Sequence, residues 1–232
     1  MSHFDGRVRK DNAGLFTVET PDGTLLCCRA ATRLRNDGKN VKPGDLVCGE
    51  DNGDGTGFIT EVRPRRNDFL RPSVCNIDLL VIAVSATTPA TPLYNIDKQT
   101  ALAALNDVDC CIAVTKCDTE PDGMQSALLR RIYTQAGCKV VVTSAVTGEG
   151  VDTLRQRLEG CVSAFSGASG AGKSSLLNAL YPAFAAQVGE ISGRISRGKN
   201  TTRLTELFKA GQSTYIADTP GFTMLGDDNA VT

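Results

Sequence analysis

The residues best suited to chemistry form one Gly-rich segment. It reads Gly167-Ala168-Ser169-Gly170-Ala171-Gly172-Lys173-Ser174 and is followed by Ser175. Its spacing matches G-x-x-x-x-G-K-[ST], the phosphate-binding loop of nucleoside triphosphatases. Glycines let backbone N–H groups turn inward around phosphate oxygens, and the N-terminus of a following helix adds a positive dipole. We expect Lys173 to reach the β and γ phosphates and Ser174 to bind Mg²⁺. A chance Gly/Ser-rich loop is the alternative, but an apolar run before and a helical run after it favour a nucleotide site.

A second motif predicts which base is bound. Thr115-Lys116-Cys117-Asp118 follows an apolar run and resembles N-K-x-D, the guanine motif of GTPases. The Asp118 carboxylate can accept hydrogen bonds from the ring N–H and the exocyclic amine of guanine, which adenine does not present. The stem of Lys116 can stack over the base. Alone, T-K-x-D is a weak signal, since strands often end in polar turns.

A third motif strengthens the guanine prediction. Thr143-Ser144-Ala145 ends the next apolar run and is similar to the S-A-x motif of GTPases. A backbone N–H near Ala145 would meet the guanine carbonyl oxygen. Two guanine motifs at successive strand ends therefore indicate GTP and GDP as ligands.

The remaining chemistry lies near the C-terminal end of the sequence. Asp218-Thr219-Pro220-Gly221 is a D-x-x-G motif, in which Asp218 should hold Mg²⁺ through water and the Gly221 N–H should sense the γ phosphate. The polar stretch 193–203 before it is typical of a mobile switch, and one threonine there should complete the Mg²⁺ shell. We favour Thr202, with Thr201 as the alternative. Lys173, Thr202 and Gly221 are thus the predicted catalytic groups.

The elements that must position these motifs follow from the apolar pattern after residue 76. Apolar runs at 77–84, 108–114, 139–143 and 161–165 alternate with helical spacing at 96–105, 125–136 and 151–158. Alternating strands and helices predict an α/β fold with a parallel sheet covered on both faces. Ligands of such sheets bind at the carboxyl ends of the strands.

Residues 1–66 have a different pattern. Five short β segments, at 6–10, 15–19, 24–28, 45–48 and 57–62, are separated by Gly, Pro, Asn and Asp turns. They predict a small closed barrel, with the oligonucleotide-binding (OB) fold as the leading candidate. We therefore divide the chain into a barrel at 1–66, a linker at 67–76 and a nucleotide domain at 77–232.

Basic residues gather at one loop of the barrel. Arg33, Arg35, Lys39 and Lys42 are the candidates for RNA phosphate contact. A solvated surface with interspersed acids explains them equally well.

The order of the motifs is informative. GTPases usually run from phosphate loop to switch, D-x-x-G, N-K-x-D and S-A, whereas here the guanine motifs come first. The cyclic order is intact, so the sequence predicts a circularly permuted GTPase domain. The chain resembles the ribosome small-subunit-dependent GTPase A family (RsgA, also YjeQ). The resemblance rests on the barrel, the permutation, the G-x-S-G-x-G-K-S-S-L-x-N segment and the T-T-R switch.

That resemblance implies a function and partners. The family consists of hydrolases that convert GTP to GDP and phosphate, bind the immature small ribosomal subunit, contact ribosomal RNA through the barrel, and leave after hydrolysis. It implies Mg²⁺ as cofactor and a cytoplasmic, monomeric protein. Two other readings stay open: a GTP-regulated ribosome-binding protein with negligible turnover, and a permuted GTPase of the large subunit. A P-loop kinase would not need the guanine motifs.

The sequence departs from the family pattern in specific places. Thr115 replaces the usual Asn, and Asn200 stands where the switch often carries a His. Phe222 occupies the position of the water-orienting Gln of many GTPases, so we expect slow hydrolysis until the ribosome docks. Phe222 packing under the switch is the alternative reading. The family continues into a helical domain with a Cys/His zinc site, whereas this sequence stops at Thr232; we expect a shortened chain without zinc.

Composition agrees with a soluble protein. The chain has 232 residues, a formal net charge of -1, and 41% hydrophobic residues. Its apolar runs are far shorter than the roughly 20 residues that span a bilayer, so we expect no membrane partner. Its nine cysteines lack metal-site spacing and are expected to be buried thiols.

Overall fold

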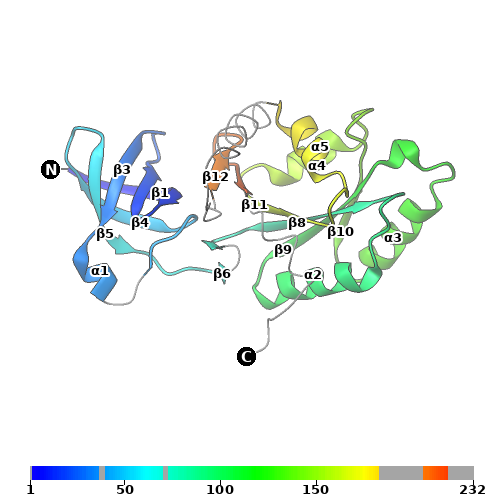
Figure 1. Cartoon of the computed structure of the whole chain (residues 1–232), viewed down its shortest axis with the longest axis horizontal. Helices are drawn as coiled ribbons and strands as arrows, with labels where there is room; N and C mark the ends of the chain where they lie inside the picture. Colours follow the sequence, from blue (N-terminus) through cyan, green and yellow to red (C-terminus); the bar gives the residue numbers. More distant parts are fainter. Residues whose placement is uncertain (1, 37–39, 70–72, 183–205, 219–232) are drawn as a thin grey trace, which may run out of the picture.

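The computed structural model describes residues 2–36, 40–69, 73–182 and 206–218, and these form two lobes (Figure 1). The predicted switch residues Thr201 and Thr202, the loop residue Lys39, and Gly221 and Phe222 lie outside the described residues. The N-terminal lobe contains only strands and one short helix, and the C-terminal lobe alternates strands and helices. Both predicted fold types are therefore confirmed.

The N-terminal lobe is a closed five-stranded barrel. It consists of β1 (Ser2–Asn12), β2 (Leu15–Glu19), β3 (Leu25–Ala30), α1 (Thr32–Asn36), β4 (Leu46–Asp51) and β5 (Thr56–Val62). The strand order is β1-β2-β3-β5-β4, and a β1–β4 pairing closes it. β3 and β5 are parallel, while the other neighbours are antiparallel. This is a Greek-key barrel of the OB type.

The barrel is held together by side chains that alternate in and out along each strand. Val18 of β2, Leu26 and Cys28 of β3, and Ile59 of β5 point inward and are at most 3% exposed. In β3 their neighbours Leu25, Cys27 and Arg29 point to solvent, as the period of two in a strand requires. Gly49 gives the inward Phe4 ring its space, because a Cβ there would lie 2.5 Å from that ring.

The C-terminal lobe is built on a parallel sheet. Its elements are β8 (Leu79–Ser85), α2 (Leu93–Leu105), β9 (Asp109–Thr115), the 3₁₀ turn η1 (Cys117–Thr119), α3 (Met124–Gln135), β10 (Lys139–Val142), α4 (Val151–Leu158), β11 (Val162–Ser166), α5 (Lys173–Leu180), β12 (Glu206–Lys209) and β13 (Tyr215–Asp218). The order β10-β9-β8-β11-β13 is parallel, and β12 joins β13 antiparallel. All five parallel strands end at the same edge, which brings the motifs together.

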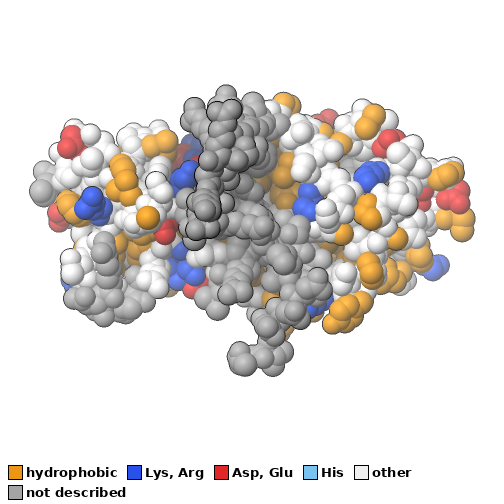
Figure 2. Space-filling view, in the orientation of Figure 1, with side chains coloured by type: hydrophobic (Ala, Val, Ile, Leu, Met, Phe, Trp, Pro, Cys, Tyr) orange, Lys and Arg blue, Asp and Glu red, His pale blue; other side chains and the backbone are white. Residues whose placement is uncertain are grey.

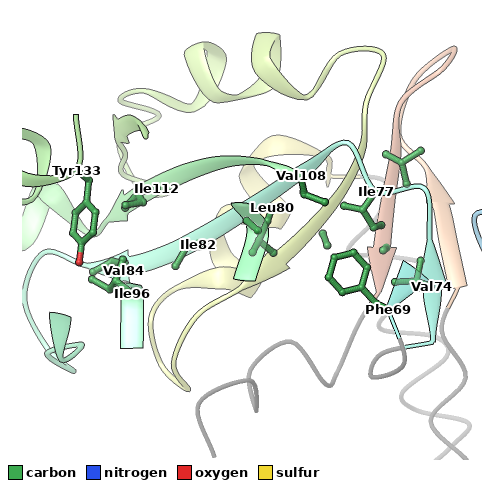
Figure 3. Packing of buried hydrophobic residues seen from close by; sticks show 14 of the residues in the cluster. Phe69, Val74, Ile77, Leu80, Ile82, Val84, Ile96, Val108, Ile112 and Tyr133 are labelled. Carbon is green, nitrogen blue, oxygen red and sulfur yellow. The ribbon is translucent and has the colours of Figure 1, made fainter. Parts of the chain in front are cut away.

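Two apolar clusters cover the faces of this sheet. On one face, α2 and α3 pack Ile96, Leu129 and Tyr133 against Ile82 and other sheet residues (Figure 3). On the other face, helices α4 and α5 contribute a second cluster that includes Leu154, Leu158 and Leu176. Every residue of β8 is buried, because helices cover both of its sides.

The two lobes are connected through the sheet and the linker. β1 pairs with β12 at Lys10 and Glu206, so barrel and parallel sheet form one eleven-stranded sheet. The predicted linker 67–76 contains a small hairpin, β6 (Asp68–Phe69) with β7 (Val74–Cys75). Asn67 donates to the carbonyl oxygen of Ile77 at 2.8 Å, which fixes the chain as it enters β8. Within the described ranges, no helix has the length and hydropathy to cross a bilayer.

Candidate nucleotide site

The phosphate loop joins β11 to α5 in the conformation that the sequence predicts. Gly167, Gly170 and Gly172 have φ angles of 133°, 77° and 85°, a region that favours glycine. Gly167 also needs its missing side chain, since a Cβ there would lie 2.3 Å from the carbonyl oxygen of Ala83. α5 begins at Lys173, directly after the loop. The first N–H groups of α5 are therefore available to an anion at the loop.

Lys173 lies across the loop. Its Nζ donates to the carbonyl oxygens of Gly167 at 2.5 Å and Ala168 at 3.1 Å. Burial lowers the pKa of this ammonium group below its ordinary value. A bound phosphate would oppose that shift by attraction, because it favours the charged form.

Thr115 connects the guanine motif to the phosphate loop. Its side chain ends β9, is 3% exposed, and donates through Oγ1 to the carbonyl oxygen of Ala171 at 2.6 Å. The carbonyl oxygen of Val84 lies 3.3 Å away as a second acceptor. The Thr115 hydroxyl therefore holds the two motifs together.

A pocket of about 220 Å³ lies where the predicted guanine residues meet. Lys116, Asp118 and Ala145 line it together with Gly172 and Ser175 of the phosphate loop. Asp118 is exposed, so its carboxylate is free to receive a base. The chemistry of this lining, an exposed carboxylate beside a lysine stem, suits guanine.

The Lys116 side chain is fixed by a residue that the motifs did not point to. Lys116 has a φ of 60°, and its Nζ donates to the carbonyl oxygen of Thr88 at 2.7 Å. Thr88 belongs to the loop after β8, and the Thr87 hydroxyl lies 2.9 Å from that of Thr119. No sequence signal marks this loop, because a backbone carbonyl is the acceptor.

The S-A loop is ordered by its own hydrogen bonds. Ser144 is fully buried, and its Oγ accepts from the backbone N–H groups of Val146 at 3.2 Å and Thr147 at 3.1 Å. Gly150, which precedes α4, has a φ of 67°, and a Cβ there would lie 2.0 Å from the carbonyl oxygen of Val142. These contacts present Ala145 to the pocket.

The predicted metal ligands are only partly described. Ser174 is exposed in the first turn of α5. Asp218 ends β13, which runs parallel to β11 with Ala217 opposite Ala164, so its backbone lies at the same sheet edge as the phosphate loop. Serine and aspartate are residue types with the oxygen donors that Mg²⁺ prefers, so the residues at this edge fit that ion by type. Elsewhere in the described ranges, no group of three His, Cys, Asp or Glu side chains is placed to hold a metal.

A buried polar pair beneath the phosphate loop was also missed by sequence reasoning. The Ser166 hydroxyl donates to Gln99 Oε1 at 2.5 Å, and Gln99 in turn donates to the carbonyl oxygen of Asn95. The pair anchors the last residue of β11 to α2. A Gln within a helical run carries no motif that would reveal this contact.

The basic residues of the barrel are placed differently from one another. Arg33 is exposed on α1, whereas the side chain of Arg35 lies outside the description. Lys42 is 8% exposed and forms an ion pair with Asp68. The structure therefore corrects the prediction for Lys42: its ammonium group holds the linker hairpin and is not presented to a phosphate.

Cysteines and a second hollow lie away from the site. All nine cysteines are free thiols, but only Cys28, Cys75 and Cys111 are buried and Cys27 is exposed, which corrects the expectation of uniformly buried thiols.

A hollow of about 610 Å³ lies at the amino ends of the parallel strands, between Asp78 and Lys139. None of the predicted nucleotide residues lines it.

Comparison with known proteins agrees with these features. A family model described as RsgA GTPase matches residues 62–227. The small ribosomal subunit biogenesis GTPase RsgA of Moorella thermoacetica is 36% identical over 222 residues, which are 96% of this chain and 76% of that protein. The protein of the same name from Caldanaerobacter subterraneus is 35% identical over 230 residues, 98% of this chain and 77% of that one.

Solved structures show the same architecture. The crystal structure of YjeQ from Thermotoga maritima matches with a TM-score of 0.84 and 32% identity, over 97% of this chain and 77% of that one. YloQ, described as a circularly permuted GTPase, matches with a TM-score of 0.77 and 27% identity, over 97% of this chain and 74% of that one. The predicted permutation is thus confirmed.

Proposed function

Because the chain belongs to the RsgA GTPase family, we propose how its own residues carry out the activity of that family. It is a GTPase of small ribosomal subunit maturation, which hydrolyses GTP to GDP and phosphate. The observation that carries the proposal for the site is the 2.6 Å hydrogen bond from Thr115 to Ala171. It joins a phosphate loop to a guanine motif in one site.

Binding of the nucleotide uses both halves of this site. The N–H groups of residues 167–175 surround the phosphates, and Lys173 leaves its two loop carbonyls to bind the β and γ phosphates. The Asp118 carboxylate accepts hydrogen bonds from the N–H groups of guanine, and the Lys116 side chain covers the base. The backbone N–H after Ser144 donates to the guanine carbonyl oxygen. Adenine would leave the Asp118 carboxylate without donors, which is costly for a desolvated charge.

Mg²⁺ is bound on the phosphate side. Ser174 and, through water, Asp218 would hold it, and Thr202 completes the set. When bound, the ion neutralises charge that develops on the phosphate oxygens during transfer. The chain's own contribution is to bring the backbone of Ser174 and of Asp218 to one sheet edge.

Hydrolysis depends on charge stabilisation and on positioning of water. Lys173 stabilises the negative charge on the γ phosphate, and the Gly221 N–H contacts the same group. No polar side chain at position 222 is present to orient the attacking water. Turnover is therefore slow until the protein binds the small subunit.

The barrel provides the contact with RNA. We assign residues 1–66 to it, 67–76 to the linker and 77–232 to the GTPase domain, and we expect a monomer that recognises ribosomal RNA as its partner. Arg33 is exposed on α1, and its guanidinium forms no ion pair with any other described residue. Arg35 and Lys39 follow it in the sequence and extend the same basic segment.

Nucleotide selectivity tests this account. Purified chain should bind GTP far more tightly than ATP in the presence of Mg²⁺. Asp118→Asn should reduce that preference, since an amide cannot accept from both guanine N–H groups, while Asp122→Asn in the following turn serves as the matched control. The ratio of GTP to ATP dissociation constants is the measurement, and an unchanged ratio in Asp118→Asn would refute the assignment of the pocket.

A further inference from the structure

Six basic side chains of the barrel are neutralised by acids. These are Arg9, Lys10, Lys42, Arg63, Arg65 and Arg66, each of which forms an ion pair with an Asp or Glu. Arg29 and Arg33 form none with any residue that the structure describes. Exposed guanidinium groups that no described acid neutralises are available to an external anion.

Arg29 lies in the middle of an exposed row that crosses three strands. It is opposite Leu15 on β2 and opposite Phe58 on β5. Partners in register project on the same face of a sheet, and all three side chains point to solvent. Phe58 is 44% exposed and Leu15 is 38% exposed, so both present apolar surface to solvent.

The next row on the same face leaves this surface open. There Thr17, Cys27 and Thr56 are in register, and all are small. No long side chain of that row covers the Phe58 ring or the Arg29 guanidinium. The face of the barrel lobe that Figure 2 shows carries hydrophobic, basic and acidic side chains side by side.

We propose that Phe58 and Arg29 form a subsite for one unpaired nucleotide of RNA. The base stacks on the Phe58 ring, and Arg29 binds the phosphate of the same or the neighbouring nucleotide. An unpaired nucleotide carries both a flat π surface and an anion, and the row offers a partner for each. The inference rests on the proposed function, because the small ribosomal subunit supplies the RNA.

The surroundings define where the phosphate lies. The row continues beyond Phe58 to Glu50 on β4, which would repel a phosphate. Arg29 lies on the other side of Phe58 in this row. The RNA phosphate should therefore lie at Arg29, with the base directed toward Phe58.

The chain allows a direct test, because it contains no Trp. Phe58→Trp keeps an aromatic platform and introduces a single fluorophore at the subsite. Titration of this variant with decaadenylate RNA at low salt should quench its fluorescence in a saturable way. Adding Arg29→Ala should weaken the binding curve at least fivefold, and Arg29→Lys should weaken it less.

Two controls separate stacking from other effects. Tyr94→Trp places the fluorophore on α2, where Tyr94 is 69% exposed and outside the barrel, and it should not be quenched. A double-stranded RNA of equal length should quench Phe58→Trp weakly, since its bases are already stacked. Absence of quenching by decaadenylate, or equal quenching by the duplex, would overturn the proposal.

The small subunit provides the second readout. Phe58→Ala should reduce co-sedimentation with small subunits by roughly fivefold or more, as loss of one stacked base predicts. Normal co-sedimentation of Phe58→Ala would refute the subsite. Loss of co-sedimentation without quenching of Phe58→Trp by RNA would also refute it, and would indicate that Phe58 contacts a ribosomal protein. GTP hydrolysis by the free variants should equal that of the unaltered chain, and absence of GTP hydrolysis by the unaltered chain itself would instead count against the proposed function.

Discussion

Thr115 occupies the first position of the guanine motif, where the N-K-x-D pattern has an amide side chain. Its hydroxyl donates to Ala171, and the backbone of that residue belongs to the phosphate loop. A threonine side chain is shorter than asparagine, so β9 and the loop must approach closely. Gly172 permits this approach, since a Cβ there would lie 3.2 Å from Thr115 Oγ1. Loss of the family's Asn therefore need not separate the two motifs.

Removal of this hydroxyl should weaken nucleotide binding. In Thr115→Val the Ala171 carbonyl loses a buried donor, which costs about 1–3 kcal/mol. Part of that cost will appear as a higher dissociation constant for GDP and GTP, on the order of tenfold. Calorimetric titration with GDP measures it, and Thr115→Ser, which keeps the hydroxyl, should bind nearly as the wild type. Equal affinity of Thr115→Val and Thr115→Ser would show that the hydrogen bond has no role.

At the scale of elements, the site depends on turns that end the parallel strands. β9, β10 and β11 each end beside a residue with positive φ: Lys116, Gly150 before α4, and Gly167. The glycines at two of these points also lie against backbone carbonyls, so no side chain fits there. The turn geometry thus determines where Asp118, Ala145 and Lys173 are presented.

Gly150→Ala tests this element. The new Cβ would lie 2.0 Å from the Val142 carbonyl oxygen and would require a φ of 67°, so the S-A loop or α4 must move. We expect the free energy of unfolding to fall by roughly 1–3 kcal/mol and GTP affinity to fall with it. Urea unfolding and GTP titration provide the two measurements. Gly148 has a similar φ of 83° but open space around it, so Gly148→Ala should lower the free energy of unfolding by less than Gly150→Ala does.

Sequence reasoning predicted these elements well because each carries a local signal. The phosphate loop, the guanine motifs and the alternation of apolar runs with helices depend on residues close together in the chain. Lys116 and Thr88 are 28 positions apart in the sequence, and Ser166 and Gln99 are 67 positions apart. They use ordinary polar groups, and only the folded packing brings them together. The burial of Lys42 was missed for the same reason, since its partner Asp68 lies in the linker hairpin.

At the scale of the whole molecule, the barrel is attached to the strands that lead to the site. β1 pairs with β12, and β12 pairs with β13, which ends at Asp218. Arg9 donates through Nε to the carbonyl oxygen of Leu207 at 2.5 Å and lies 5.3 Å from the centre of the Tyr215 ring. A movement of the barrel on RNA would therefore act directly on the strand that carries the D-x-x-G motif.

Glu19 is the centre of this connection. It is 4% exposed, and it forms ion pairs with Arg9 of the barrel and with Lys209 of β12. Burial opposes ionisation of its carboxyl, but hydrogen bonds from Lys209 and Arg9 outweigh that effect and lower its pKa below the ordinary 4.5. A lowered pKa in the folded state stabilises the protein above pH 4.5, and this contribution is lost as the pH falls through the folded value.

Glu19→Gln should therefore destabilise the protein at neutral pH and reduce its sensitivity to acid. We expect a loss of about 1–3 kcal/mol at pH 7, since the half-buried Arg9 and the exposed Lys209 lose the buried carboxylate that they pair with, and a smaller difference from the wild type at pH 4 and below. Urea unfolding at both pH values measures it. Glu206→Gln, which breaks the more exposed pair with Lys10, should cost less than about 1 kcal/mol. A pH-independent difference for Glu19→Gln would contradict the ionic role of this residue.

The most direct test of the central claim is phosphate release from GTP by the purified chain with and without small ribosomal subunits. Large subunits serve as the partner control and ATP as the nucleotide control. The site described above predicts slow release alone and an increase on the order of tenfold or more with small subunits, for GTP but not ATP. Unchanged release at saturating small subunits would contradict a ribosome-stimulated GTPase and favour a binding protein with negligible turnover. Equal stimulation by large subunits would contradict the assigned partner.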